Sequence, residues 1–179
     1  VGIPRNDDFN GAEQEGVGYY HVTQKGGARC SAAAAYLKPA MERDNLSVET
    51  GAQVTKVTVE DGRATGVVYK QDGDRHEVDA DAEVVVSGGA VNSPQLLMCS
   101  GIGPADHLTD HGIDVQVDLP GVGRNRQDHL FAFTVYERTS GPPDPAATTN
   151  IAESGGFVRT EPDLDAPNLQ FHFAPVYYM

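Results

Sequence analysis

Hydrophobic and polar residues alternate along the middle of the chain, which indicates short β-strands separated by tight turns. The alternating segments are residues 46–50, 54–60, 65–70 and 75–78. Many of their apolar residues are β-branched, and Asp61 and Gly62 form a pair typical of a hairpin turn. The pattern therefore predicts a small antiparallel meander.

Residues 83–86 have a different pattern, because three consecutive valines replace the alternation. Such a run is typical of a strand that is buried on both faces in the middle of a parallel sheet. Ser93 and Pro94 follow, and they predict a helix with Ser93 as its N-cap that ends near Gly101. This stretch therefore predicts a strand, a turn and a helix.

Weaker signals complete the pattern on both sides of this unit. The glycine-containing first twenty residues are expected to be irregular. Helices are expected at residues 32–37, where Ser31 is the predicted N-cap, and at residues 105–111, where Gly112 is the C-cap. Short strands are expected at residues 115–117, 131–136, 157–160 and 169–173, with loops at residues 120–129 and 141–150.

The turn between the predicted strand and helix is the strongest candidate for ligand binding. Ser87, Gly88 and Gly89 follow the valine run directly, and glycines let a ligand approach the backbone closely. The free N–H groups at a helix N-terminus favour phosphate or another electron-rich group. A tight βα turn without any ligand explains the same residues equally well. Both interpretations remain open from the residues alone.

Other candidate motifs are incomplete. The two Gly-x-Gly stretches at residues 101–103 and 121–123 lack the third glycine of a dinucleotide-binding fingerprint. His107 and His111 have a spacing that can chelate a metal, but residues at the end of a solvated helix explain them better, so no metal site is predicted. Asp128 with His129, and His172 between Phe171 and Phe173, are each compatible with an acid–base pair or with a core histidine whose hydrogen bonds are satisfied, and spacing alone favours the core histidine. No set of residues amounts to a catalytic centre.

The charge of the chain excludes some classes of partner. The 26 acidic and 13 basic residues give a formal net charge of −13, and such a surface repels nucleic acid and anionic lipid. No stretch is apolar enough for a membrane span, and the N-terminus lacks the features of a secretory signal. Two cysteines, Cys30 and Cys99, exclude a disulfide framework and are expected to be small core residues. A cytoplasmic location is expected.

Several ordered motifs resemble the glucose–methanol–choline (GMC) flavoprotein oxidoreductases, in particular members that are similar to choline dehydrogenase. Residues 89–103 are similar to the second signature of that family. The other similar segments are residues 10–20, 31–37, 121–129, 155–159 and 168–173. Arg126 stands where relatives usually carry leucine, and residues 26–29 match their motif loosely. The resemblance extends over nearly the whole chain.

This resemblance implies an α/β fold (α+β for this piece alone) that is part of a larger enzyme. Residues 1–130 would form a partial FAD-binding, Rossmann-like domain with the meander, and residues 131–179 would begin a substrate-binding domain. Val54 would contact the adenine of FAD through its backbone, and Asp128 and His129 would lie near the flavin side of the substrate cavity. The full set of implied cofactor-binding residues is Val54, Ser87, Gly88, Gly89, Asn92, Asp128 and His129.

The family's glycine-rich strand–helix unit and its catalytic histidine have no counterpart in this sequence. The chain is therefore expected to be the middle part of an enzyme that transfers hydride from the carbon of a small alcohol to flavin N5, and to be inactive alone. FAD is expected in the intact protein, whether or not this piece retains it. Open sheet edges are expected to favour self-association. A non-catalytic binding or scaffold module derived from the same fold remains the alternative.

The acidic surface also leads to a prediction about salt. Only four of the 13 basic residues are lysine, and acid-rich, lysine-poor surfaces suit a cytoplasm with high salt. Because salt screens the repulsion among carboxylates, we expect the melting temperature to rise between dilute buffer and molar KCl. Thermal unfolding followed by circular dichroism measures this. An unchanged melting temperature would favour the simpler interpretation, an ordinary acidic protein.

Overall fold

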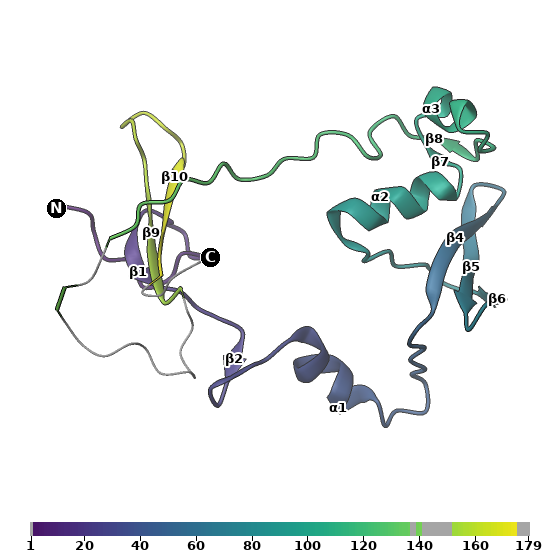
Figure 1. Cartoon of the computed structure of the whole chain (residues 1–179), viewed down its shortest axis with the longest axis horizontal. Helices are drawn as coiled ribbons and strands as arrows, with labels where there is room; N and C mark the ends of the chain where they lie inside the picture. Colours follow the sequence, from purple (N-terminus) through teal and green to yellow (C-terminus); the bar gives the residue numbers. More distant parts are fainter. Residues whose placement is uncertain (1, 137–138, 141–151, 175–179) are drawn as a thin grey trace. The chain divides into compact units, whose positions relative to one another are not determined.

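The computed structural model describes residues 2–136, 139–140 and 152–174 of the 179-residue chain. Contacts divide the chain into two compact units, which are described one at a time (Figure 1). Unit 1 comprises Val1–Ser47 and Val135–Met179, and unit 2 comprises Val48–Thr134. The described residues form a mixed α/β structure with mainly antiparallel sheets, which confirms the predicted fold class. A division by contacts does not test the predicted cofactor and substrate domains, so their boundary after residue 130 stays a prediction.

Unit 1 is built on a three-stranded antiparallel sheet in the order β1-β9-β10 (Figure 1). Its strands are β1 (Gly16–Tyr19), β9 (Ser154–Val158) and β10 (Leu169–Phe173). The expectation of an irregular N-terminal segment was wrong where β1 forms. The partner strand of β1, β9, lies more than a hundred residues away in sequence. The local sequence pattern around β1 therefore does not predict a strand.

Shorter elements complete unit 1. They are the two-stranded hairpin of β2 (Gln24–Lys25) and β3 (Ala28–Arg29), a widened helical segment η1 (Ala33–Leu37) and α1 (Lys38–Ala40). The helix expected at residues 32–37 is thus present and continues to Ala40. The Ser31 hydroxyl accepts a hydrogen bond from the Ala34 N–H at 3.3 Å, although Ala32 is the residue at the cap position.

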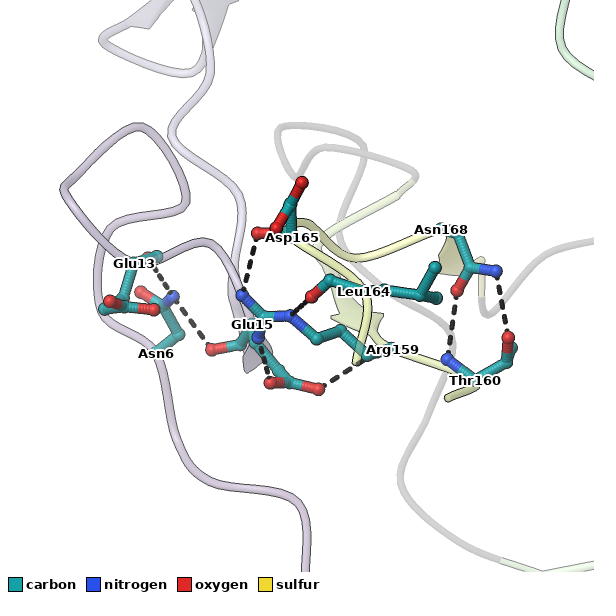
Figure 2. Close-up of polar contacts among 8 residues, drawn as sticks. All are labelled: Asn6, Glu13, Glu15, Arg159, Thr160, Leu164, Asp165 and Asn168. Carbon is teal, nitrogen blue, oxygen red and sulfur yellow. Dashed lines mark hydrogen bonds and ion pairs between the residues drawn. The ribbon is translucent and has the colours of Figure 1, made fainter. Parts of the chain in front are cut away.

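A polar clamp joins the segment before β1 to the connection between β9 and β10 (Figure 2). The Glu15 carboxylate accepts hydrogen bonds from the Arg159 backbone N–H at 2.9 Å and from the Arg159 guanidinium. The same guanidinium donates to the backbone carbonyls of Leu164 at 2.9 Å and Asp165 at 3.3 Å. The Arg159 backbone N–H, together with its side chain, holds the pKa of Glu15 below its ordinary value.

Unit 2 contains the predicted meander. Strands β4 (Gln53–Glu60), β5 (Arg63–Gln71) and β6 (Asp74–Asp79) pair antiparallel in that order, which confirms the alternating pattern of residues 54–60, 65–70 and 75–78. The remaining elements of this unit are α2 (Gly89–Cys99), β7 (Ile102–Gly103), α3 (Ala105–Asp110) and β8 (Val117–Asp118).

Three predicted strands are absent from the structure. Residues 46–50, 83–86 and 131–136 have no strand geometry and no cross-strand partner among the described residues. Val85 was expected to lie in a strand that is buried on both faces of a parallel sheet. Its side chain is instead 76% exposed. Strand propensity reflects packing against neighbouring strands, so an apolar run without neighbours does not form a strand. The loop expected at residues 141–150 lies outside the described residues.

Helix α2 begins earlier than predicted. It starts at Gly89 with Gly88 at the cap position, so Ser93 and Pro94 lie inside the helix rather than at its start. Pro94 is the sixth residue of this helix, so it lacks the N–H that would otherwise bond to the Ala90 carbonyl within the helix. Cys99, expected in the core, is exposed, whereas Cys30 is half-buried.

A buried serine joins α2 to the meander, and α2 lies alongside β4 (Figure 1). Ser100 is 1% exposed. Its hydroxyl accepts a hydrogen bond from the Val57 N–H at 2.8 Å and donates one to the Leu96 carbonyl at 2.6 Å. Val57 and Val68 are the buried apolar residues of the meander. The Ser100 hydroxyl therefore accepts a hydrogen bond from the buried Val57 N–H, which has no partner in a neighbouring strand among the described residues.

The Gly-x-Gly stretch after α2 has a structural role. Gly101 has φ +83°, and a Cβ there would lie 2.4 Å from the Asp114 carbonyl oxygen. A Cβ on Gly103 would lie 2.9 Å from Met98 Cγ. These glycines let β7 pair in parallel with β8 above the fully buried Leu108. Close packing therefore favours glycine at both positions.

We predict that Ser100→Ala destabilises the chain by about 1–3 kcal/mol, because it leaves the buried Val57 N–H without an acceptor. Urea unfolding followed by circular dichroism measures the change. Thr109→Ala is the matched control, since this exposed hydroxyl bonds only to Ala105 within α3 and its loss should cost less than about 0.5 kcal/mol. Equal losses in the two variants would show that Ser100 has no special role.

We predict that Glu15→Gln lowers the melting temperature at neutral pH and that this difference shrinks in acid. Because the folded-state pKa of Glu15 is lowered, its stabilising effect is complete above its ordinary pKa of about 4.5 and is lost as the pH falls through the folded value. Melting curves of both proteins between pH 7 and pH 3 measure the difference. Glu77→Gln is the control, because Glu77 forms only an exposed pair with Arg75. A difference that is independent of pH would contradict the clamp.

Candidate functional site

The candidate site in unit 2 is the turn that leads into α2. Ser87 and Gly88 are exposed, and no side chain caps the N-terminus of this 11-residue helix. The N–H groups of the first helical turn have no partners within the helix, and the helix dipole adds partial positive charge there. The turn can therefore accept an anionic group such as a phosphate.

Two glycines shape this turn in different ways. Gly89 has φ +84°, a conformation that favours glycine, and nothing lies within 4 Å of the position a Cβ would take. A Cβ on Gly88 would lie 3.2 Å from both Asn92 Cβ and the Ser93 nitrogen. Gly88 thus lets the turn fold tightly onto the helix, and the space in front of Gly89 is open. Asn92, in the first turn of α2, is exposed next to them.

Val54 lies on β4, the edge strand of the meander, opposite Tyr69. Its side chain is half-buried, and its backbone carbonyl accepts a hydrogen bond from the Gln53 side-chain amide at 3.2 Å. The Val54 carbonyl thus already accepts a hydrogen bond from a side-chain amide in the structure. Another N–H donor, such as the amino group of an adenine, can take the same position.

Asp128 and His129 lie in the irregular segment that follows β8. Both are exposed, and Asp128 forms an ion pair with Arg126 at 3.2 Å and accepts the His129 backbone N–H at 3.0 Å. Within the described residues, no hydrogen bond or ion pair joins either of them to the turn before α2 or to Val54. The structure therefore brings together Ser87, Gly88, Gly89 and Asn92, but not the other three predicted cofactor residues.

Surface hollows do not coincide with the predicted residues. A hollow of about 220 Å³ lies beside α3 and includes His107, Asp118 and Arg124. A second one, of about 120 Å³, lies beside Phe9, Tyr20 and Phe157 in unit 1. Both are smaller than the usual 300–1,000 Å³ of ligand pockets. Neither hollow includes a predicted cofactor-binding residue.

The described part of the chain contains no group of three His, Cys, Asp or Glu side chains that could hold a metal ion. The His107 and His111 rings lie 4.5 Å apart, and His111 Nδ1 lies 3.1 Å from the His107 carbonyl. None of the described helices is long and apolar enough to cross a membrane.

Sequence reasoning missed two residues that fix helices of unit 2. Ser100 fixes α2 against β4, and Asp118 accepts the Ala105 N–H at 3.0 Å, which caps α3. Their partners come from other elements, so a pattern along the chain does not reveal them. A serine directly after an apolar helix was the only sequence signal for Ser100.

Comparisons with known proteins identify the family. The family model described as GMC oxidoreductase matches residues 1–131, which is most of the chain. An alcohol dehydrogenase [acceptor] of Pseudomonas putida is 46% identical over 98% of this chain and 36% of its own length. An oxygen-dependent choline dehydrogenase of Staphylococcus saprophyticus is 44% identical over 98% of this chain and 35% of its own length. The chain belongs to the GMC oxidoreductase family.

Solved structures agree with this assignment. Pyridoxine 4-oxidase from Mesorbium loti matches 94% of this chain and 32% of its own, with a TM-score of 0.79 and 34% identity. A fungal aryl-alcohol oxidase matches 87% of this chain and 31% of its own, with a TM-score of 0.72 and 27% identity. An FAD-dependent oxidoreductase from Chaetomium thermophilum matches 66% of this chain and 21% of its own, with a TM-score of 0.61 and 28% identity. The chain thus spans about a third of the length of the curated relatives it matches.

Proposed function

We propose that this chain is part of an FAD-dependent oxidoreductase that oxidises the CH–OH group of a small-molecule alcohol. The observation that carries the proposal is the uncapped N-terminus of α2 with open space in front of Gly89, in a chain of the GMC family. The relatives named for alcohol, choline and aryl alcohol support the substrate class. The relative named as FAD-dependent supports the cofactor.

The residues of this chain fit part of an FAD site. The N–H groups at the turn of Ser87, Gly88 and Gly89 would lie beside the dinucleotide of FAD, next to the exposed Asn92, and can bind an electron-rich group there. The backbone of Val54 would accept a hydrogen bond from the adenine, in place of the Gln53 amide. FAD, when bound, supplies the acceptor at N5 for the hydride that leaves the alcohol carbon.

The proposal assigns no catalytic base to this chain. Asp128 and His129 would lie near the flavin side of the substrate cavity, where an exposed carboxylate and imidazole can bind and orient a polar substrate. The group that removes the hydroxyl proton belongs to another part of the enzyme, so the chain alone is proposed to be inactive. A cytoplasmic location is likewise a proposal, and fractionation of cells that express the gene tests it.

Titration with FAD tests the function. We expect no tight FAD binding by the 179-residue chain, and binding with alcohol-dependent bleaching of the flavin by the same sequence extended in frame at both ends. Flavin fluorescence and calorimetry measure the affinity. No binding by either form would favour the alternative, a non-catalytic scaffold module. Turnover of an alcohol with a dye acceptor by the 179-residue chain would contradict its proposed inactivity.

A matched pair of glycine variants tests the site. Gly89 and Gly112 both have positive φ, +84° and +69°, and nothing lies within 4 Å of either Cβ position. Alanine at either position should cost about 1–2 kcal/mol of stability through backbone strain. Only Gly89→Ala should also weaken FAD binding by the extended protein, by about tenfold or more, because its methyl group occupies the ligand's space. Equal FAD affinity in the two variants would exclude the turn as the cofactor site.

A further inference from the structure

Strand β4 contains one extra residue next to Val54. Strands β4 and β5 lie side by side in the meander (Figure 1). Val54 pairs with Tyr69, but the next pair along the two strands is Lys56 with Val68. Thr55 therefore has no partner of its own on β5, and this arrangement is a β-bulge. Such bulges change the direction of neighbouring groups and are common next to active sites.

The hydrogen bond from Val57 to Ser100 establishes the direction of the backbone groups along β4. The Val57 N–H donates to the Ser100 hydroxyl on the α2 side, so it points away from β5. The N–H and C=O groups of successive residues alternate between the two sides of a strand, so those of Lys56 point toward β5. Lys56 and Val68 are thus a hydrogen-bonded pair of the antiparallel ladder.

The bulge reverses the direction of the backbone groups of Val54. Strand β5 is regular at this point, and Tyr69 follows Val68, so the pair of Tyr69 with Val54 is of the non-hydrogen-bonded kind. In such a pair, the N–H and C=O of each residue point away from the other strand. Val54 therefore directs both groups away from β5. Without the bulge, Thr55 would pair with Tyr69, and Val54 would turn the same two groups toward β5.

A second hydrogen bond agrees with this direction. The Val54 carbonyl accepts the side-chain amide of Gln53 at 3.2 Å, a donor that does not belong to β5. The proposed function assigns this same carbonyl to the adenine of FAD. The amide thus marks a position from which an N–H donor reaches the Val54 carbonyl without competing with the hydrogen bonds of the sheet.

The Thr55 side chain holds the bulge in place. Its hydroxyl donates to the Val68 carbonyl at 3.2 Å. Thr55 is half-buried and Val68 is 6% exposed, so water competes little for this bond. On the other side of β5, the ring of Tyr69 stacks on that of His76 with centroids 5.0 Å apart. These contacts fix the register of β5 opposite the bulge, and with it the orientation of Val54.

We propose that Thr55 is a positioning residue for the adenine of FAD. Its hydroxyl holds the bulge, and the bulge directs the backbone groups of Val54 away from β5 and toward the adenine. Thr55 acts through Val54, because its own hydroxyl is bound to the Val68 carbonyl. This inference rests on the proposed function, since that function places the adenine at Val54.

Hydrogen exchange in the 179-residue chain tests the direction of Val54 without any cofactor. We expect the Val54 amide to exchange about tenfold faster than the Lys56 amide or more, because the first points away from β5 and the second is bonded to it. NMR spectroscopy measures both rates in one sample. A Val54 amide that is as well protected as the Lys56 amide would overturn the proposal, whatever the protein binds.

FAD binding by the protein extended in frame at both ends tests the role of the Thr55 hydroxyl. Thr55→Val keeps the shape of the side chain and removes the hydroxyl, so we expect FAD affinity to fall about threefold to tenfold, as for the loss of one neutral hydrogen bond. Thr55→Ser restores the hydroxyl and should bind FAD as the wild-type protein does. Calorimetry measures the affinities, and circular dichroism verifies that each variant folds.

Thr65→Val is the matched control for the loss of a hydroxyl. Thr65 is the extra residue at the second irregularity of the meander, where the register with β4 shifts between Thr58 and Val59. It is half-buried like Thr55, and its hydroxyl donates to the Thr58 hydroxyl at 3.2 Å. Because this irregularity does not orient Val54, Thr65→Val should leave FAD affinity unchanged.

The outcomes separate this inference from the proposed function. Wild-type FAD affinity in Thr55→Val, or equal weakening by Thr55→Val and Thr65→Val, would overturn the role of Thr55 and leave the proposed function standing. Weakening that Thr55→Ser does not reverse would also overturn it, because the hydroxyl would then not be the cause. Absence of FAD binding by the extended wild-type protein would contradict the proposed function, and this inference with it.

Discussion

The pairing of backbone N–H and C=O groups between neighbouring strands is the constraint on which the rest of this structure depends. Each extended segment that finds a partner becomes a strand, whether the partner is next in sequence, as in the meander, or distant, as for β1 and β9. Segments 83–86 and 131–136 have equally apolar sequences and find none among the described residues. Most of their side chains stay exposed, although Val84 and Val86 are half-buried, because apolar character alone does not satisfy the backbone.

The same constraint explains why one serine matters to the candidate site. The Val57 N–H lies inside unit 2, where no strand accepts it, and the Ser100 hydroxyl provides the missing acceptor. That bond fixes the C-terminal end of α2 against β4. The N-terminal end of α2 carries the turn at Ser87, Gly88 and Gly89, and Val54 lies on β4 of the meander. A cofactor wall made of backbone groups needs this rigidity, since its donors cannot reorient as side chains do.

The comparisons establish the family of the chain, whereas its chemistry has to be argued from the geometry of the site. Family membership rests on a match over residues 1–131 and on relatives more than 40% identical. The chemistry of an individual member lies in its site, and folds alone do not determine it. In this chain, the turn before α2 is the proposed piece of a site, while Asp128 and His129 lie in an irregular segment and have no hydrogen bond or ion pair to that turn among the described residues. A partial wall of this kind is consistent with the third of the relatives' length that the chain spans.

The sequence by itself determined the meander, the helix at residues 105–110 and the glycine-rich turn before α2, because hairpin turns, caps and alternation act over a few residues. It also led to the family through ordered motifs. Tertiary structure alone decided the rest: that β1 pairs with β9, that Glu15 is held by Arg159, and that Ser100 joins α2 to β4. It also decided that three apolar runs do not become strands. Each of these outcomes depends on a pairing partner that is distant in sequence or is lacking among the described residues. The local sequence pattern contains no information about such partners.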